Sequence, residues 1–341
     1  MAIFGLAMNG FREITNLASR SFTDAIASYS GLQTEMANIS TLFESDTTTI
    51  KNLEKGIIAL STQVPLSTQS LGRAMYEAMS AGIAVGDSLQ FVETSSRIAI
   101  AGMTDTRTSV DVLTTVLNSY KMSSDEAMRV SDILFQTVKL GKTTFEQLAP
   151  TMSTVTPIAA ILGVSIEEVS GAIATLTKQG TPTAEATTQI ARAMTAFVEK
   201  TTEGEELAKK FGLNLSVSAF ETKSFQEVLN EMYIAVGGNI EEFKRFFPTI
   251  QGFQAALKLV GSNAKGAEED LQAMYKSTGA TEEATKKMIG TIDSKMSIFE
   301  NNITAFKQGV GASLAPIASF AIDTGSAILT VITKYQTPLK Y

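Results

Sequence analysis

The amino-acid sequence predicts an all-α protein, an array of stacked helical hairpins followed by a long C-terminal helix. Two observations lead to this fold class. Apolar residues recur at spacings of three and four along most of the chain, which is the period of an amphipathic helix. Residues that start and stop helices recur at a fixed interval, and no useful stretch alternates apolar and polar residues as a strand would.

Composition limits the functions that the chain can have. Of 341 residues, 44% are hydrophobic, which is enough for a sizeable core. Lys and Arg number 28 against 35 Asp and Glu, and this net charge of −7 argues against specific nucleic-acid binding. Cys and His are absent, so disulfides, thiolate nucleophiles, imidazole bases and Cys/His metal sites are excluded. What remains for catalysis is a carboxylate pair, a Lys or a Ser/Lys dyad. We predict no catalytic, metal-binding or cofactor-binding residues.

The N-terminal segment, residues 1–64, is expected to form a small helical region. Its first residues, MAIFGLAMNGFREITNLASRSF, contain a weak apolar run but no basic stretch before it and no convincing cleavage site. We expect no signal peptide there.

The clearest hairpin lies in the segment ILGVSIEEVSGAIATLTKQGTPTAEA, residues 161–186. Ser165 and Glu168 form the pattern of a capping box, which predicts a helix start. Gly180 supplies a left-handed end to that helix, and Thr181-Pro182 then opens the next one. The first helix carries the apolar stripe Ile166, Val169, Ile173 and Leu176, and the second carries Ala186, Ile190, Met194 and Phe197.

The same order of signals occurs upstream. Ser123 with Glu126 predicts a helix that stops at Gly141, and Thr143 with Glu146 predicts the start of the next. Before them, an apolar stripe predicts a helix through Val110, Leu113, Leu117 and Tyr120.

The repeat has a period of 39 residues. VSDILFQTVKLGKTT (130–144) and VSGAIATLTKQGTPT (169–183) align without a gap at this offset. FVETSSRIAIAGMTD (91–105) aligns less well but places Gly102 at the matching position. A fixed period of helix, glycine turn and helix indicates stacked α-hairpins, each of which buries its stripe against a neighbour. We assign residues 65–280 to this array.

The end of the array is less regular. Ser224 with Glu227 predicts a helix that ends at Gly237-Gly238. The segment FKRFFPTIQGFQAALKLVG (243–261) is rich in Phe, which leaves nucleic-acid stacking as one interpretation. A short helix that docks its Phe side chains into the core is favoured, because little positive charge surrounds them.

From about Thr281 the pattern changes, and residues 281–341 are expected to form a long amphipathic and apolar helix. Helical spacing continues over about 50 residues, or roughly 75 Å at 1.5 Å per residue. A stripe of this length indicates a coiled coil, a transmembrane helix or a partner-binding arm. The residues expected to mediate self-association or membrane contact are Phe299, Ile303, Phe306, Val310, Leu314, Ile317, Phe320 and Ile328.

Residues 309–333 are apolar apart from Asp323 and are long enough for a bilayer crossing. The carboxylate near the centre makes insertion costly by roughly 3 kcal/mol. Packing against another copy of the chain is therefore favoured, with host membrane contact through this segment as the alternative.

Three stretches together resemble the core region of phage tail tape-measure proteins: STQVPLSTQSLGRAMYEAMSAG (61–82), FEQLAPTMSTVTPIAAILGVSIEEVSGAIATLTKQGTPTAEATTQIARAM (145–194) and GASLAPIASF (311–320). The resemblance implies a structural rod in the lumen of a virion tail, of a phage, prophage or related injection particle. It implies length determination, genome delivery, assembly in the host cytoplasm, and contacts with tail tube subunits and assembly chaperones. Such proteins are usually much longer, so the chain is expected to be a fragment, the product of a truncated gene or a compact member.

Two other functional classes compete with this interpretation. A membrane-active, pore-forming helical protein would use the C-terminal helix. A murein hydrolase would need two carboxylates that face each other across a cleft. The adjacent pairs such as Glu167-Glu168 and Glu205-Glu206 occupy consecutive helical positions, which do not face each other, so we expect no enzyme activity.

Overall fold

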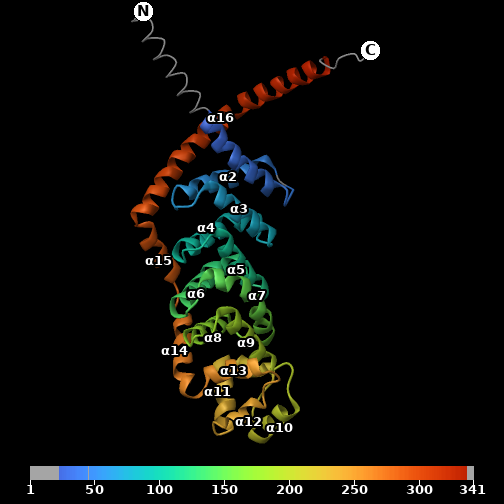
Figure 1. The fold of residues 1–341 in the computed structure, drawn as a ribbon, viewed down its shortest axis with the longest axis vertical. Helices are drawn as coiled ribbons and strands as arrows, with labels where there is room; N and C mark the ends of the chain where they lie inside the picture. The colour runs from blue at the N-terminus through green and yellow to red at the C-terminus, as the bar shows by residue number, and fades with distance from the viewer. Residues whose placement is uncertain (1–22, 45, 336–341) are drawn as a thin grey trace, which may run out of the picture. The chain divides into compact units, whose positions relative to one another are not determined.

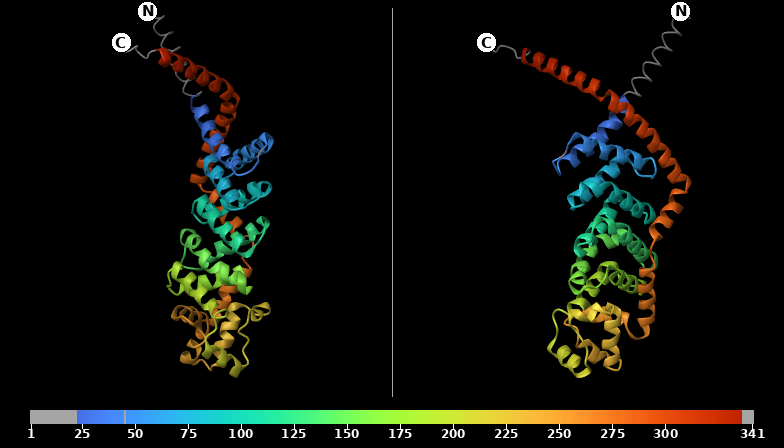
Figure 2. Two further views of the ribbon diagram at one scale, coloured as in Figure 1. Left: turned by 90° about the vertical axis from the view of Figure 1, so that its right-hand side faces the viewer. Right: turned by 180° about the vertical axis from the view of Figure 1, so that it is seen from behind.

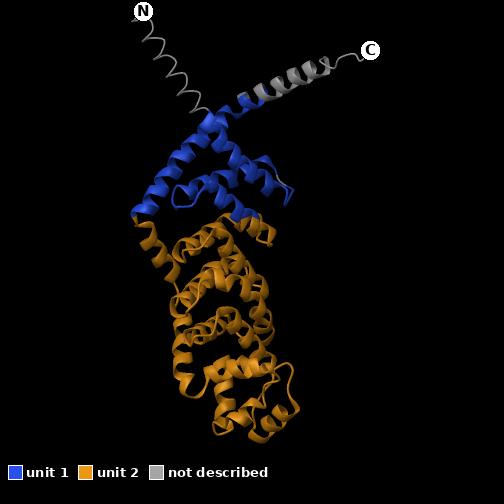
Figure 3. Ribbon diagram, viewed as in Figure 1, with its two compact units in different colours: residues 1–76, 292–341 blue, residues 77–291 orange. Residues whose placement is uncertain are grey.

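The computed structural model describes residues 23–44 and 46–335, with the side chains of α16 (Ile292–Tyr335) described as far as residue 320 except that of residue 317. Regular structure in these residues is wholly helical, which confirms the all-α prediction. The chain forms two compact units (Figure 3). Unit 1 contains residues 1–76 and 292–341, and unit 2 contains residues 77–291.

Unit 2 is built from two layers of helices. One layer stacks α5, α7, α9 and α13, and the other stacks α4, α6 and α8, so that each hairpin contributes one helix to each layer (Figures 1 and 2). The hairpin helices are α4 (Val85–Ala101), α5 (Thr106–Tyr120), α6 (Ala127–Leu140), α7 (Phe145–Leu162), α8 (Ile166–Lys178) and α9 (Thr183–Thr195). The predicted stripe residues of α8 are fully buried between these layers.

Polar bonds join equivalent positions of successive hairpins in unit 2. Asn118 Nδ2 donates to the Ala81 carbonyl at 3.0 Å, a separation of 37 residues. Further cross-hairpin bonds, separated by 37 to 40 residues, are Ser124 to Asp87, Thr156 to Ser119, Arg129 to Glu167 and Thr183 to Thr143. These separations bracket the period in the sequence, so the repeat corresponds to the stacking interval.

The end of the array contains shorter elements around an aromatic cluster. These elements are α10 (Thr202–Phe211), η2 (Val217–Glu221), α11 (Phe225–Ala235), α12 (Ile240–Lys244), α13 (Ile250–Leu259) and η3 (Gly261–Asn263). Phe243, Phe246, Phe247 and Phe253 are buried, and Phe243 lies against the other three rings. The prediction of a short helix that docks its rings is confirmed, and buried rings cannot stack on nucleic acid.

The last part of unit 2 runs back along the layer of α4, α6 and α8. α14 (Ala264–Tyr275) packs on α8 and α6, and α15 (Ala280–Ile289) packs on α6 and α4 (Figure 1). The attachment is partly polar. Asp132, only 3% exposed, accepts the backbone N–H groups of Gly279 at 2.7 Å and Thr281 at 2.9 Å. Thr285 donates to the Arg97 carbonyl at 3.1 Å.

Some predicted helix signals are correct and others are not. The capping boxes at Ser165 and Ser224 are present, with side-chain and backbone bonds in both directions. Ser123 instead precedes a 3-10 turn, η1 (Ser124–Glu126), and its side chain makes no cap bond. Glu126 pairs with Arg129 at 2.6 Å and so is not available to close a box. The cap of α7 is Thr144, since its neighbour Thr143 bonds across to Thr183.

The turn glycines also divide into two groups. Gly180 has a positive φ of 91° and acts as predicted, and Gly163 ends α7 with a positive φ of 76°. Gly102 and Gly141 have negative φ, so a left-handed end does not explain them. A Cβ atom at Gly102 would lie 2.3 Å from the Phe145 ring. Close packing between neighbouring hairpins therefore requires glycine at that position.

Unit 1 contains a helix over residues 23–40, α2 (Thr47–Ser61), the first part of α3 (Thr68–Ser80) and α16. α16 has 44 residues, or about 66 Å of helix at 1.5 Å per residue. The long helix thus begins at Ile292, later than the expected start near Thr281. Residues 280–289 form the separate helix α15 of unit 2. Its Thr281 and Thr285 are buried where it packs on α4 and α6, and Gly290 ends the helix.

Candidate self-association surface

The predicted contact residues lie on α16 of unit 1. Five of them are exposed on the helix: Phe299 (61%), Ile303 (42%), Phe306 (74%), Val310 (37%) and Phe320 (73%). Leu314 is half-buried. The side chains of Ile317 and Ile328 lie outside the described residues. Two further exposed apolar residues, Ile292 and Met296, extend the surface toward the start of α16.

The exposed residues follow one seam along the helix. Ile292, Met296, Phe299, Ile303, Phe306 and Val310 are separated by four, three, four, three and four residues. This alternation is the spacing of the a and d positions in a heptad repeat, where each residue inserts between residues of a partner helix. We call these six residues the seam. An exposed apolar stripe of this length on a protein surface is typical of an interaction site.

The opposite side of α16 packs within unit 1 and carries two amides that bond to it. Asn301 Nδ2 lies within 3.0 Å of three carbonyl oxygens, those of Ser61, Val64 and Leu66, at the end of α2 and in the turn after it. These groups have no helical partner of their own, since α2 ends at Ser61. The amide of Asn301 therefore closes that helix end.

A second amide repeats the contact seven residues later. Gln308 is 2% exposed, and its Nε2 donates to Thr68 Oγ1 at 2.8 Å and to the Ser28 carbonyl at 3.3 Å. Asn301 and Gln308 share one heptad position and lie opposite the seam. α16 thus turns amides toward its own unit and aromatic rings away from it, which is the reverse of an ordinary surface helix.

The helix crossing in unit 1 is close. A Cβ atom at Gly311 would lie 2.4 Å from the Ala25 carbonyl oxygen and 2.8 Å from Tyr29 Cβ. Lys307 approaches Asp24 at 3.8 Å beside this crossing. Glycine at 311 lets α16 contact the helix over residues 23–40 at backbone distance, which holds the seam on the outward side.

Sequence reasoning located the stripe but did not identify the residues that orient it. Asn301 and Gln308 were not predicted, although their seven-residue spacing opposite the seam is visible in the sequence. In a two-helix coiled coil this position is solvent-exposed, so a polar residue there gives no reason to expect burial.

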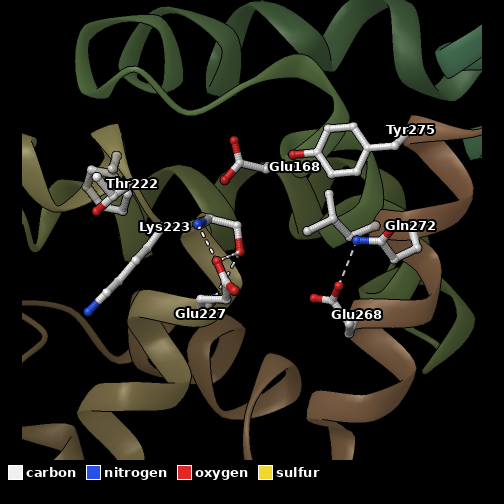
Figure 4. A pocket seen from close by; sticks show the side chains of 10 residues that line it. Glu168, Thr222, Lys223, Glu227, Glu268, Gln272 and Tyr275 are labelled. Carbon is white, nitrogen blue, oxygen red and sulfur yellow. Dashed lines mark hydrogen bonds between the residues drawn. The ribbon is translucent and has the colours of Figure 1, made fainter.

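Three carboxylates of unit 2 meet at one pocket. Glu168, Glu227 and Glu268 surround it, with Tyr275 and Gln272 on the α14 side (Figure 4). Glu168 accepts the N–H groups of Ser165 and Phe225, both at 2.6 Å, and so links the starts of α8 and α11. Glu227 accepts the Ser224 N–H, and Glu268 accepts from Gln272. Burial raises the pKa of the Tyr275 hydroxyl, and Glu168 raises it further.

The bonds of Glu168 and Glu227 are helix-capping bonds, which fix the starts of α8 and α11, and Glu268 bonds to Gln272 within α14. The adjacent residues Glu167 and Glu168 make different contacts. Glu168 closes the capping box and is 6% exposed, whereas Glu167 pairs with Arg129 of the preceding hairpin. Within residues 23–44 and 46–335, no group of three acidic side chains is arranged to hold a metal ion.

Among the described residues, no helix combines enough length with enough apolar character to span a membrane.

Comparison with known proteins gives two kinds of match. Residues 54–300 match the family model of the phage-related minor tail protein. The chain is 30% identical over 316 residues, 89% of its length, to the probable tape measure protein of Clostridium phage phiCD119. It is 20% identical over 268 residues, 77% of its length, to the tape measure protein of Pneumococcus phage Dp-1. The chain spans 33% and 23% of these two relatives. No solved structure matches the chain significantly.

Proposed function

From the premise that the chain belongs to the family of phage-related minor tail proteins of the tape-measure type, we propose that it contributes length to a tail rod. We also propose that it self-associates through α16. A tape-measure relationship implies a place in the virion tail and contact with other tail components. We further propose tail tube subunits and assembly chaperones as those components, with assembly in the host cytoplasm and a part in genome delivery.

The observation that carries this proposal is the exposed seam of α16. Six large apolar side chains lie in heptad register on a helix whose other face is already bonded to unit 1. Their exposure to water is unfavourable, by roughly 25 cal/mol per Å² of apolar surface. Burial of these side chains against a partner helix would therefore make association favourable. A helix bundle joined along such a seam forms the rod that a tape measure requires.

Self-association is tested with the double variant Phe299→Glu/Phe306→Glu in the full chain. We expect the wild type to sediment as an oligomer and the variant as a monomer, because each charge would enter the seam without a partner. The matched control is Ile161→Glu/Ile234→Glu, which changes two unit 2 residues of similar exposure, 67% and 65%. A wild-type chain that stays monomeric without detergent would contradict the proposal.

Lipid is the competing partner for the seam and for residues 309–333. Vesicle flotation and leakage measured on the same variants separate the two partners. Association that appears only with vesicles, and is lost in the Phe299→Glu/Phe306→Glu variant, would favour a membrane-active role over self-association.

The contribution to length is tested in a phage that carries this gene. Inserting 28 residues, four heptads of helix-forming sequence, after Phe320 should lengthen the tail by up to about 42 Å, at 1.5 Å per residue. The same number of Gly/Ser residues inserted at Gly237-Gly238, a turn, should leave tail length unchanged. Equal tail lengths in both insertions, measured by electron microscopy, would contradict the ruler role.

We also propose that the chain has no catalytic role. The family is structural, and Glu168, Glu227 and Glu268, the carboxylates that meet at one pocket, are engaged in bonds that start or support helices. Turnover of peptidoglycan by the purified chain would overturn this.

A further inference from the structure

We propose that α16 pairs with α16 of a second copy of this chain as a parallel, in-register coiled coil over residues 292–310. This inference rests on the proposed self-association and specifies its direction and register.

The seam has a defined length. If Met296 is assigned to position a of the heptad, the other a positions are Ile303 and Val310, and the d positions are Phe299 and Phe306. The next d position is Ser313, whose hydroxyl bonds back to the Gly309 carbonyl at 3.1 Å. The unbroken run of apolar layers therefore ends at Val310. Ile303 and Val310 are β-branched, which suits the a positions of a parallel pair.

The charges beside the seam favour one direction. In this register Lys295 is a g position and Glu300 is an e position. In a parallel, in-register pair, each g residue faces the e′ residue five positions later, so Lys295 of one copy meets Glu300 of the other, twice per pair. In an antiparallel pair g faces g′ and e faces e′, which cannot join these two residues.

Both charges are available for such a contact. Lys295 and Glu300 are exposed, and neither forms an ion pair within the described part of the chain. The next e residue, Lys307, already approaches Asp24 of its own unit. Lys295 and Glu300 are therefore the charge pair that can select direction.

Pairing requires no rearrangement of unit 1. The contacts of Asn301, Gln308 and Gly311 with unit 1 lie away from the a and d positions. A second α16 can therefore occupy the seam of each copy while the amide bonds remain in place.

The test uses full-length Lys295→Glu, Glu300→Lys and the double variant Lys295→Glu/Glu300→Lys. Each single change places like charges together at two sites per pair, and we expect about tenfold weaker association in sedimentation at low salt. The double variant reverses both charges and should return to within roughly twofold of wild type. The matched control is Lys265→Glu/Glu269→Lys on α14, an exposed pair at 3.9 Å that lies outside the seam.

Direction is measured independently by disulfide formation. The chain has no Cys, so a single introduced Cys reports one contact. Met296→Cys and Val310→Cys should each form disulfides between identical variants under mild oxidation. A disulfide formed only when Ile292→Cys is mixed with Val310→Cys, the two ends of the seam, would show antiparallel pairing and overturn the inference.

The outcomes separate this inference from the proposed function. If Phe299→Glu/Phe306→Glu abolishes association but the charge exchanges change nothing, self-association stands and the parallel register is wrong. Weakening by the single variants without recovery in the double variant also contradicts it. If the wild type does not associate at all, both fail.

Discussion

Asn301 and Gln308 show how single amides orient a whole helix at the residue scale. A side-chain amide has two N–H donors, and those of Asn301 reach three carbonyl groups at 2.9 to 3.0 Å, so one N–H is shared between two of them. Those carbonyls lie where α2 ends, so the same side chain holds α16 and completes α2. The burial of these amides is the reason that the apolar side of α16 remains outside.

Asn301→Asp keeps the shape of the side chain but replaces its donors with acceptors. We expect it to destabilise unit 1 by about 1–3 kcal/mol, because three carbonyl groups lose their donor and face an anion. Hydrogen exchange over residues 47–66 measures the effect. Asn302→Asp, on the exposed neighbour, is the control and should change stability by less than about 0.5 kcal/mol. Equal effects of the two variants would contradict the role given to Asn301.

Leu176 and Glu167 lie on the same helix, α8, and contribute unequally to unit 2. Leu176 is fully buried, so Leu176→Asp should cost more than about 3 kcal/mol through an unpaired buried charge. Glu167→Ala removes the ion pair with Arg129 of the preceding hairpin and should cost about 0–1 kcal/mol. Thermal unfolding compares them, and similar melting temperatures would mean that the stripe of α8 is wrongly assigned.

At the scale of elements, the two glycines of α16 differ in their surroundings. A Cβ atom at Gly309 would meet nothing within 4 Å, whereas one at Gly311 would overlap the Ala25 carbonyl. Gly309→Ala should stabilise α16 by up to about 1 kcal/mol through helix propensity. Gly311→Ala should destabilise unit 1 by about 1–3 kcal/mol, since the helices must separate. In denaturant unfolding, the change in the free energy of unfolding should have opposite signs for the two variants.

The elements also show what sequence alone can predict. The stripe of α8, its capping box at Ser165 and the 39-residue period depend on neighbouring residues, so local patterns predict them correctly. The outward direction of the α16 stripe was anticipated only from its length. Its physical cause, the amide contacts of Asn301 and Gln308, joins residues separated by 235 to 280 positions. The spacing of the two amides is visible in the sequence, but their distant partners on the helix over residues 23–40 and near α2 are not.

At the scale of the whole molecule, α15 belongs to unit 2 although the sequence pattern runs through it into α16. A chain that ends at Gly290 should therefore keep the helices of unit 2 and remain monomeric, because the seam is removed. A chain that ends at residue 284 also loses the bonds of Thr285 and should be less stable by about 1–2 kcal/mol. Sedimentation and thermal unfolding of both chains test this, and oligomers from the first chain would contradict it.

The return of α14 and α15 along unit 2 has a consequence for the order of folding. Asp132 leaves the ribosome 147 residues before its backbone partner at Gly279. At about 5–20 residues per second, this contact waits roughly 7–30 s after Asp132 is made. The hairpins of α4, α6 and α8 thus emerge first. The surface that packs against α14 and α15 remains exposed to solvent until synthesis reaches residue 289. Nascent-chain folding of unit 2 is therefore completed by its last residues.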